Sequence, residues 1–358
     1  MKRAVLIFAA FLLMPLAVPA QDVPEIPFDS VPNFLKPPQD LHFGEVTGVA
    51  VDSKGNVYVF SRGNTTGPAY GASAAQLLEF GPDGRFIREI GKNLYAWSFG
   101  HTVRIDAQDN IWVADKGSDM VIKFNQQGRV MMVFGRKQEA SDEGTEPLKH
   151  VRPPLPPEPG RFRQVTDMAW DAAGNTYISD GYVNSRVAKV DKDGKWLKSF
   201  GEPGDQPGQL NTPHSIAIDA QGNVYVANRG NSRIEVFDGE GKYLRQIKIS
   251  VPFDYANSIP AIGNKPGPNV IGTMGPGAPW AVCITPGPNQ VLYASDAFPG
   301  RLYKLSLDGK VLGWLGESGK QPKQFGWIHE IACPSENTVI VGELLNWRAQ
   351  KLILRPAR

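Results

Sequence analysis

The chain has 358 residues, of which 41% are hydrophobic and 21% charged, so it can bury a large core. Its 38 Lys and Arg residues nearly balance its 36 Asp and Glu residues. The sequence also has no basic stripe that would bind nucleic acid and no charge block typical of a polyelectrolyte tail. We therefore expect a globular protein that does not bind nucleic acid.

Residues 1–20 have the pattern of a secretory signal peptide. Two basic residues come first, an apolar run follows, and small residues precede the expected cleavage before Gln21. A membrane anchor is the alternative, but Pro15 interrupts the run, which is short for a membrane span. We predict an exported protein, periplasmic or secreted, that is free of the membrane after cleavage.

Six copies of one pattern then follow along the chain. Each copy has an alternating apolar strand, a short turn and a second apolar strand, as in a β-hairpin. The first strands of the copies are residues 47–52, 101–106, 166–171, 214–219, 280–285 and 329–334. In the first five copies a third strand, a glycine turn and a fourth strand come next. Four strands per copy and a period of roughly 50 to 65 residues predict an all-β fold, a six-bladed β-propeller.

The sixth copy stops after its third strand, at residues 352–358. Residues 28–44 precede the first copy and are candidates for the missing outer strand. We assign residues 21–43 to an N-terminal segment that closes the ring and residues 44–358 to the propeller.

Two long segments between copies, residues 136–160 and 251–279, have no strand pattern. Such long connections in a compact domain are usually functional. We expect them to lie over one face of the disc as walls or a lid.

Cys283 and Cys333 are the two cysteines. Both fall in predicted strands, where a free cysteine packs as a small apolar residue. One disulfide is the alternative for an exported protein, although a large core does not require it. We favour two free, buried thiols.

Three of the five histidines take the same place in the pattern. His101, His214 and His329 begin the first strands of copies two, four and six. The odd copies begin instead with Thr47, Thr166 and Trp280. The first strand of a propeller blade lines the central channel, so alternate blades bring the three imidazoles towards one point. Three neutral imidazoles with an open fourth position form the ligand set of a zinc site.

The alternative is that histidine merely suits a polar turn in this repeat. Histidines would then also occur in the odd copies, which have none at this position. We predict a metal site with zinc as the preferred metal, and iron, manganese and copper remain alternatives.

A second set of residues lies just past the second strand of each copy, near the same face. Its members are Arg62, Lys116, Gly181 followed by Tyr182, Arg229, Ala297 and Leu344. An arginine offers a forked, permanently charged donor to a carboxylate. A phenol beside a divalent metal shifts towards phenolate and then acts as a base. Arginines and tyrosines at turns are more often structural. A functional role for this second set therefore depends on its sharing one site with the three histidines.

Over residues 44–354 the chain resembles the NHL-repeat propellers and, among them, the peptidyl-α-hydroxyglycine α-amidating lyase family. The motifs are VYVFSRGN at 57–64, SDGYVNSR at 179–186, TPHSIAI at 212–218, VANRGNSRI at 226–234 and the pair His329-Glu330. The resemblance implies that the three histidines bind zinc. It also implies that Tyr182 is the catalytic base and that Arg62 and Arg229 hold the substrate carboxylate.

The implied reaction splits a carbinolamide into a peptide amide and glyoxylate. The resemblance further implies a structural calcium ion in the channel. Its ligands would be Glu330, which stands where the family has aspartate, and backbone carbonyls near Val49 and Val103.

Two other functions stay open. A lactonase-type hydrolase usually relies on a carboxylate-rich calcium site, and the histidine ring argues against it. A non-catalytic NHL propeller that binds a peptide or protein partner fits the fold equally well. We favour an exported zinc-dependent lyase that acts, as a monomer, on a small or peptide substrate with a carboxylate.

Overall fold

The computed structural model describes residues 23–63, 75–137 and 157–355. The predicted signal peptide and residues 138–156 of the first long connection lie outside them. No helix in these three ranges has the length and apolarity that a membrane span needs.

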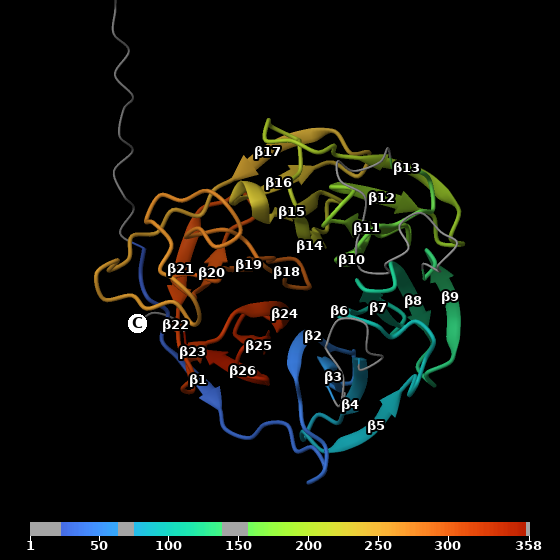
Figure 1. Ribbon diagram of the computed structural model, residues 1–358, viewed down its shortest axis with the longest axis horizontal. Helices are drawn as coiled ribbons and strands as arrows, with labels where there is room; N and C mark the ends of the chain where they lie inside the picture. The colour runs from blue at the N-terminus through green and yellow to red at the C-terminus, as the bar shows by residue number, and fades with distance from the viewer. Residues whose placement is uncertain (1–22, 64–74, 138–156, 356–358) are drawn as a thin grey trace, which may run out of the picture.

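Six four-stranded antiparallel sheets surround a common centre, which confirms the predicted six-bladed propeller (Figure 1). Blades one and two consist of β2 (Glu45–Val51), β3 (Val57–Arg62), β4 (Ala75–Phe80), β5 (Phe86–Ile90), β6 (Gly100–Ile105), β7 (Ile111–Asp115), β8 (Met120–Phe124) and β9 (Val130–Phe134). Blades three and four consist of β10 (Asp167–Trp170), β11 (Thr176–Asp180), β12 (Arg186–Val190), β13 (Trp196–Phe200), β14 (Pro213–Ile218), β15 (Val224–Asn228), β16 (Arg233–Phe237) and β17 (Tyr243–Ile247), with the 3₁₀ turn η1 (Arg229–Asn231) after β15.

Blades five and six consist of β18 (Val282–Ile284), β19 (Leu292–Ser295), β20 (Leu302–Leu305), β21 (Val311–Leu315), β24 (Ile328–Ser335), β25 (Thr338–Glu343), β26 (Arg348–Leu354) and β1 (Phe28–Val31). The short strands β22 (Glu317–Ser318) and β23 (Gln324–Phe325) form a parallel pair between these two blades. Figure 1 shows β2, β6, β10, β14, β18 and β24 innermost, next to the channel.

The strand nearest the N-terminus completes the sixth blade. β1 pairs with β26 in antiparallel register, with Phe28 opposite Leu354. The outer strand of this sheet therefore comes from one end of the chain and its other three strands from the opposite end, so the ring is closed by hydrogen bonds between distant segments.

An aspartate at the end of the innermost strand shapes the following turn. In blade one, Oδ1 of Asp52 accepts hydrogen bonds from the backbone N–H groups of Lys54 and Asn56, at 2.9 and 2.8 Å. Gly55 between them has a φ of 84°, a left-handed conformation that glycine adopts without a steric penalty. Equivalent bonds are made by Asp106, Asp171 and Asp219.

The apolar side chains are buried mainly between neighbouring blades. Between blades one and two, for example, the rings of Phe60 and Trp97 have centroids 5.0 Å apart. Trp97 also packs against Phe124 at 6.2 Å. A single blade cannot bury its faces, so the stability of each blade depends on the next one.

The structure pairs the two cysteines in a disulfide, so the expectation of free thiols was wrong. Cys283 lies in β18 of blade five and Cys333 in β24 of blade six. These inner strands lie side by side at the channel, which brings together residues 50 positions apart in the sequence. That proximity depends on how the two blades pack and is not visible in the pattern of one copy.

One arginine connects most of the blades at the channel. Arg104 of β6 in blade two donates from Nε and Nη2 to the two carboxylate oxygens of Asp167 in blade three, at 2.9 and 2.6 Å. Its Nη2 also lies 2.8 Å from Oε1 of Glu330 in blade six. Further acceptors within 3.5 Å are Ser215 Oγ of blade four, the Val282 carbonyl of blade five and the Ile331 carbonyl of blade six.

The disulfide leads to a first prediction. Denatured, unreduced protein should show no free thiols in a thiol titration, and reduction should release two. Replacing both cysteines by serine should lower the free energy of unfolding by about 2–4 kcal/mol, because the disulfide restricts the unfolded chain. Urea unfolding measures this loss, and two thiols in unreduced protein would contradict the pairing.

The contacts of Arg104 lead to a second prediction. Arg104→Ala leaves the carboxylate of Asp167 buried without its cation and removes a polar partner of Glu330, which should cost about 3–5 kcal/mol in urea unfolding. The control is Arg85→Ala, because the Arg85 side chain is 81% exposed and its ion pair with Asp83 lies on the surface. That variant should change stability by less than about 0.5 kcal/mol. Equal stability of the two variants would refute a central role for Arg104.

Candidate active site

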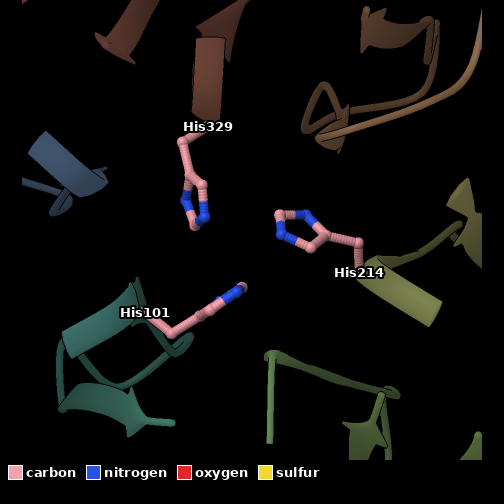
Figure 2. Close-up of side chains that lie close together, drawn as sticks. All are labelled: His101, His214 and His329. Carbon is pink, nitrogen blue, oxygen red and sulfur yellow. The ribbon is translucent and has the colours of Figure 1, made fainter. Parts of the chain in front are cut away.

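The three histidines of the even blades converge at the channel. His101 lies in β6, His214 in β14 and His329 in β24, and Figure 2 shows their rings pointing towards one another. All three are buried, and one ring nitrogen of each lies within 4.8 Å of those of the others. The residues that the sequence predicted as metal ligands thus form one cluster.

A hydrogen bond to the next blade orients each ring. The three Nδ1 atoms lie 2.6–2.8 Å from backbone carbonyl oxygens, and the acceptors are Thr166, Trp280 and Thr47. A carbonyl oxygen only accepts, so each Nδ1 carries the proton and each Nε2 keeps its lone pair. The acceptors are the residues that the odd copies carry at the histidine position. The sequence pattern alone indicates no role for these three residues.

The environment keeps the imidazoles neutral. Burial is the main cause that lowers the pKa of all three histidines well below 6.5. The positive charges of Arg62 and Arg229 lower the pKa of His329 further. A neutral imidazole with a free Nε2 is the form that binds metal, so this set fits a zinc ion with an open fourth position.

Tyr182, just past β11, is beside this cluster. Its hydroxyl oxygen lies 3.2 Å from Nε2 of His214 and 3.4 Å from Nε2 of His101. Nη2 of Arg229 donates to the same oxygen at 3.4 Å. Burial alone would raise the pKa of this phenol, but Arg229 and two further cations outweigh burial and lower the pKa below 10.0. The phenol is thereby prepared to lose a proton.

Arg229 begins the turn η1 and is 5% exposed. Its guanidinium carbon lies 4.4 Å from the centroid of the Trp280 indole ring. Its Nε is buried and has no acceptor among the described residues. A carboxylate bound here would satisfy that donor, so Arg229 is suited to the predicted role.

Arg62, at the end of β3, is more strongly engaged with protein groups than the sequence suggested. Its Nη1 lies 2.6 Å from Oε2 of Glu45, and its Nε donates to the carbonyl of Gly100 at 2.9 Å. Its guanidinium also lies 3.6 Å from the centroid of the Phe99 ring. Arg62 contributes to the lowered pKa of Tyr182, but Glu45 already neutralises part of its charge.

Lys116 is a third cation, to which sequence analysis assigned no role. Its Nζ lies 3.9 Å from the centroid of the Tyr182 ring, and its charge lowers the pKa of both Tyr182 and His101. The signal was present in the sequence, because Lys116 holds the same position in copy two as Arg62 in copy one and Arg229 in copy four.

The surroundings of Glu330 do not fit the calcium ion that the resemblance implied. One carboxylate oxygen contacts Arg104 and the other accepts a hydrogen bond from Thr102. Burial raises the pKa of Glu330 to about 8, although Arg104 opposes this. Val49 and Val103 are buried in β2 and β6, and Val49 lines a cavity of about 250 Å³ together with Arg104. Both carboxylate oxygens of Glu330 are thus already engaged by protein groups, whereas Ca²⁺ would need them as ligands.

The second long connection, residues 251–279, contacts the rim of this site. The indole nitrogen of Trp280 donates to the carbonyl of Thr273 at 2.8 Å. The N–H of Gly272 donates to Oγ of Ser232, just past η1, at 2.9 Å. Met274 packs against Trp280. This connection therefore supplies part of the wall beside Arg229.

Comparisons with known proteins agree with this fold. The family model described as NHL repeat matches residues 210–237. A streptogramin B lyase structure aligns with a TM-score of 0.55 and 12% identity, covering 92% of this chain and 98% of that one. At this identity the likeness shows the fold alone.

Three curated proteins are similar in sequence. Peptidyl-glycine α-amidating monooxygenase A of Xenopus laevis is 29% identical over 336 residues, covering 86% of this chain but 31% of that protein. NHL repeat-containing protein 3 of Mus musculus is 32% identical, covering 55% of this chain and 53% of that protein. Peptidyl-α-hydroxyglycine α-amidating lyase 2 of Drosophila melanogaster is 27% identical, covering 55% of this chain and 48% of that protein. The chain thus spans about a third to a half of the length of these relatives.

The chain is accordingly a six-bladed β-propeller with an NHL repeat matched at residues 210–237, and it is similar to the peptidyl-α-hydroxyglycine α-amidating lyases.

Proposed function

We propose that the chain is an exported, zinc-dependent lyase that cleaves a peptidyl-α-hydroxyglycine, or a related carbinolamide, to an amide and glyoxylate. The observation that carries the proposal is the sharing of one buried site by the three histidines, Tyr182 and Arg229. A protein that only binds a partner has no need of this combination.

Each residue of the site has a separate role in the proposed reaction. Zinc, held by the three Nε2 atoms, would supply Lewis acidity towards the substrate hydroxyl. Arg229, with Lys116 and Arg62 adding positive charge, binds and neutralises the carboxylate. Tyr182 takes the hydroxyl proton. As the C=O bond of glyoxylate forms, the C–N bond breaks and the amide nitrogen gains one proton, so the reaction balances without a further reactant.

Export is part of the proposal and rests on residues 1–20. The disulfide between Cys283 and Cys333 supports it, because the cytosol keeps most thiols reduced whereas exported proteins retain disulfides.

A non-catalytic NHL propeller is the second candidate. The similarity to NHL repeat-containing protein 3 favours it, because that name states no reaction. The two candidates differ in their need for a metal and for Tyr182, and the following experiments separate them.

Mature protein purified without chelator should contain about one zinc ion per chain by elemental analysis. His214→Ala removes one of three ligands and should lose the metal. His42→Ala is the matched control, because His42 is exposed and lies outside the histidine cluster, and it should keep the zinc. Wild-type protein without any transition metal would favour the second candidate.

Zinc-loaded protein should release glyoxylate from α-hydroxyhippurate. Tyr182→Phe removes only the phenolic oxygen and should lower kcat about 100- to 10,000-fold, the usual contribution of an acid–base group. Its zinc content should stay unchanged, which separates a chemical role from a folding defect. Tyr95→Phe, at a residue 63% exposed, should retain full activity. Full activity in Tyr182→Phe would refute the assigned base.

A further inference from the structure

The rim around the histidines is polar on one side and apolar on the other. The position at the end of the second strand holds Arg62, Lys116 and Arg229 in blades one, two and four, and Gly181, which Tyr182 follows, in blade three. In blades five and six it holds Ala297 and Leu344. The blades are equivalent by geometry, so this difference belongs to the side chains and not to the fold.

Four side chains extend the apolar part, and we call them the apolar set: Met274, Trp280, Trp327 and Leu345, which pack around Ala297 and Leu344. The ring of Trp280 has its centroid 5.5 Å from that of His214 and 6.3 Å from that of His329. The ring of Trp327 lies 5.2 Å from that of Trp280. The apolar set therefore adjoins two of the three metal-ligand candidates.

Trp327 has one feature that packing alone does not explain. Its indole N–H is buried and has no acceptor among the described residues. Its left-handed φ of 61° belongs to the repeat, because Gln164 and Thr212 adopt the same conformation at the equivalent place in blades three and four. Trp327, Met274 and Leu345 are also only partly buried, whereas Trp280 is 5% exposed. A ligand can thus reach the three outer members of the set.

Arg229 joins the two parts of the rim. Its guanidinium lies 4.4 Å from the Trp280 ring, and its Nε lacks an acceptor. A carboxylate held by Arg229 therefore has the apolar set on one side and the histidines on another. A ligand that fits this arrangement carries a carboxylate and, on the other side of its reacting carbon, an apolar group.

We propose that the apolar set is a subsite for the N-acyl group of the substrate and selects an aromatic or branched apolar group before the hydroxyglycine. This rests on the proposed lyase function and names the substrate class for it. Trp327 and Met274, two of the three members that a ligand can reach, determine this specificity.

The test compares two substrates that share the reacting group. Glyoxylate release by the zinc-loaded mature protein is measured with N-benzoyl-α-hydroxyglycine and with N-acetyl-α-hydroxyglycine. Burial of an aromatic ring in the subsite should make kcat/KM for the benzoyl compound about 10- to 100-fold higher. A ratio near one overturns the subsite.

Variants assign the preference to the residues. Trp327→Ala should reduce the benzoyl-to-acetyl ratio about tenfold, mainly through KM for the benzoyl compound. Trp347→Ala is the matched control, because Trp347 also has a left-handed φ, of 50°, but is 63% exposed and outside the apolar set. It should leave the ratio unchanged. Met274→Ala should reduce the ratio as well, and it tests the subsite if Trp327→Ala does not fold.

A binding measurement keeps the two proposals separable. N-benzoylglycine and N-acetylglycine lack the hydroxyl group and are not cleaved, so their dissociation constants report on the subsite alone. Tighter binding of N-benzoylglycine, by about tenfold or more, supports the subsite even if neither substrate releases glyoxylate, in which case the lyase function fails. Equal binding together with equal turnover overturns the subsite while the lyase function stands.

Discussion

Each histidine of the site donates its Nδ1–H to a backbone carbonyl of the next blade, and the chemistry of the site depends on these three hydrogen bonds. They leave every Nε2 lone pair free, and they do so only while the blades keep their order around the ring. The even blades supply the ligands and the odd blades supply the acceptors. The closed ring is thus a condition for the site, because an open arc of blades would leave at least one imidazole without its acceptor.

The channel contains a second polar layer beside the histidines. Arg104 contacts groups from four blades besides its own, and it neutralises the buried carboxylate of Asp167 and contacts Glu330. This layer supplies positive charge from the chain itself. The histidines are the proposed metal ligands, whereas the Arg104 guanidinium serves the packing of the inner strands.

Six equivalent positions around a ring need not carry six equivalent functions. The position past the second strand holds a cation in three blades, Gly181 followed by the phenol of Tyr182 in a fourth, and small or aliphatic side chains in the other two. Arg229 lies at the boundary, against Trp280. The repeat thus supplies a common geometry. Single side chains within it make one part of the rim charged and the other part apolar.

The amino-acid sequence alone determined the number of blades, their four strands and the position that His101, His214 and His329 share. Equivalent positions can be identified by aligning the copies of a repeat. The sequence also contained Arg104, at a position where the other copies have alanine or cysteine, although its meaning depended on Asp167 and Glu330 from other blades. The tertiary structure decided the disulfide, the histidine tautomers and the partners of Arg62. These features join residues far apart in sequence, and their distances follow from how the blades pack against one another, which no single copy encodes.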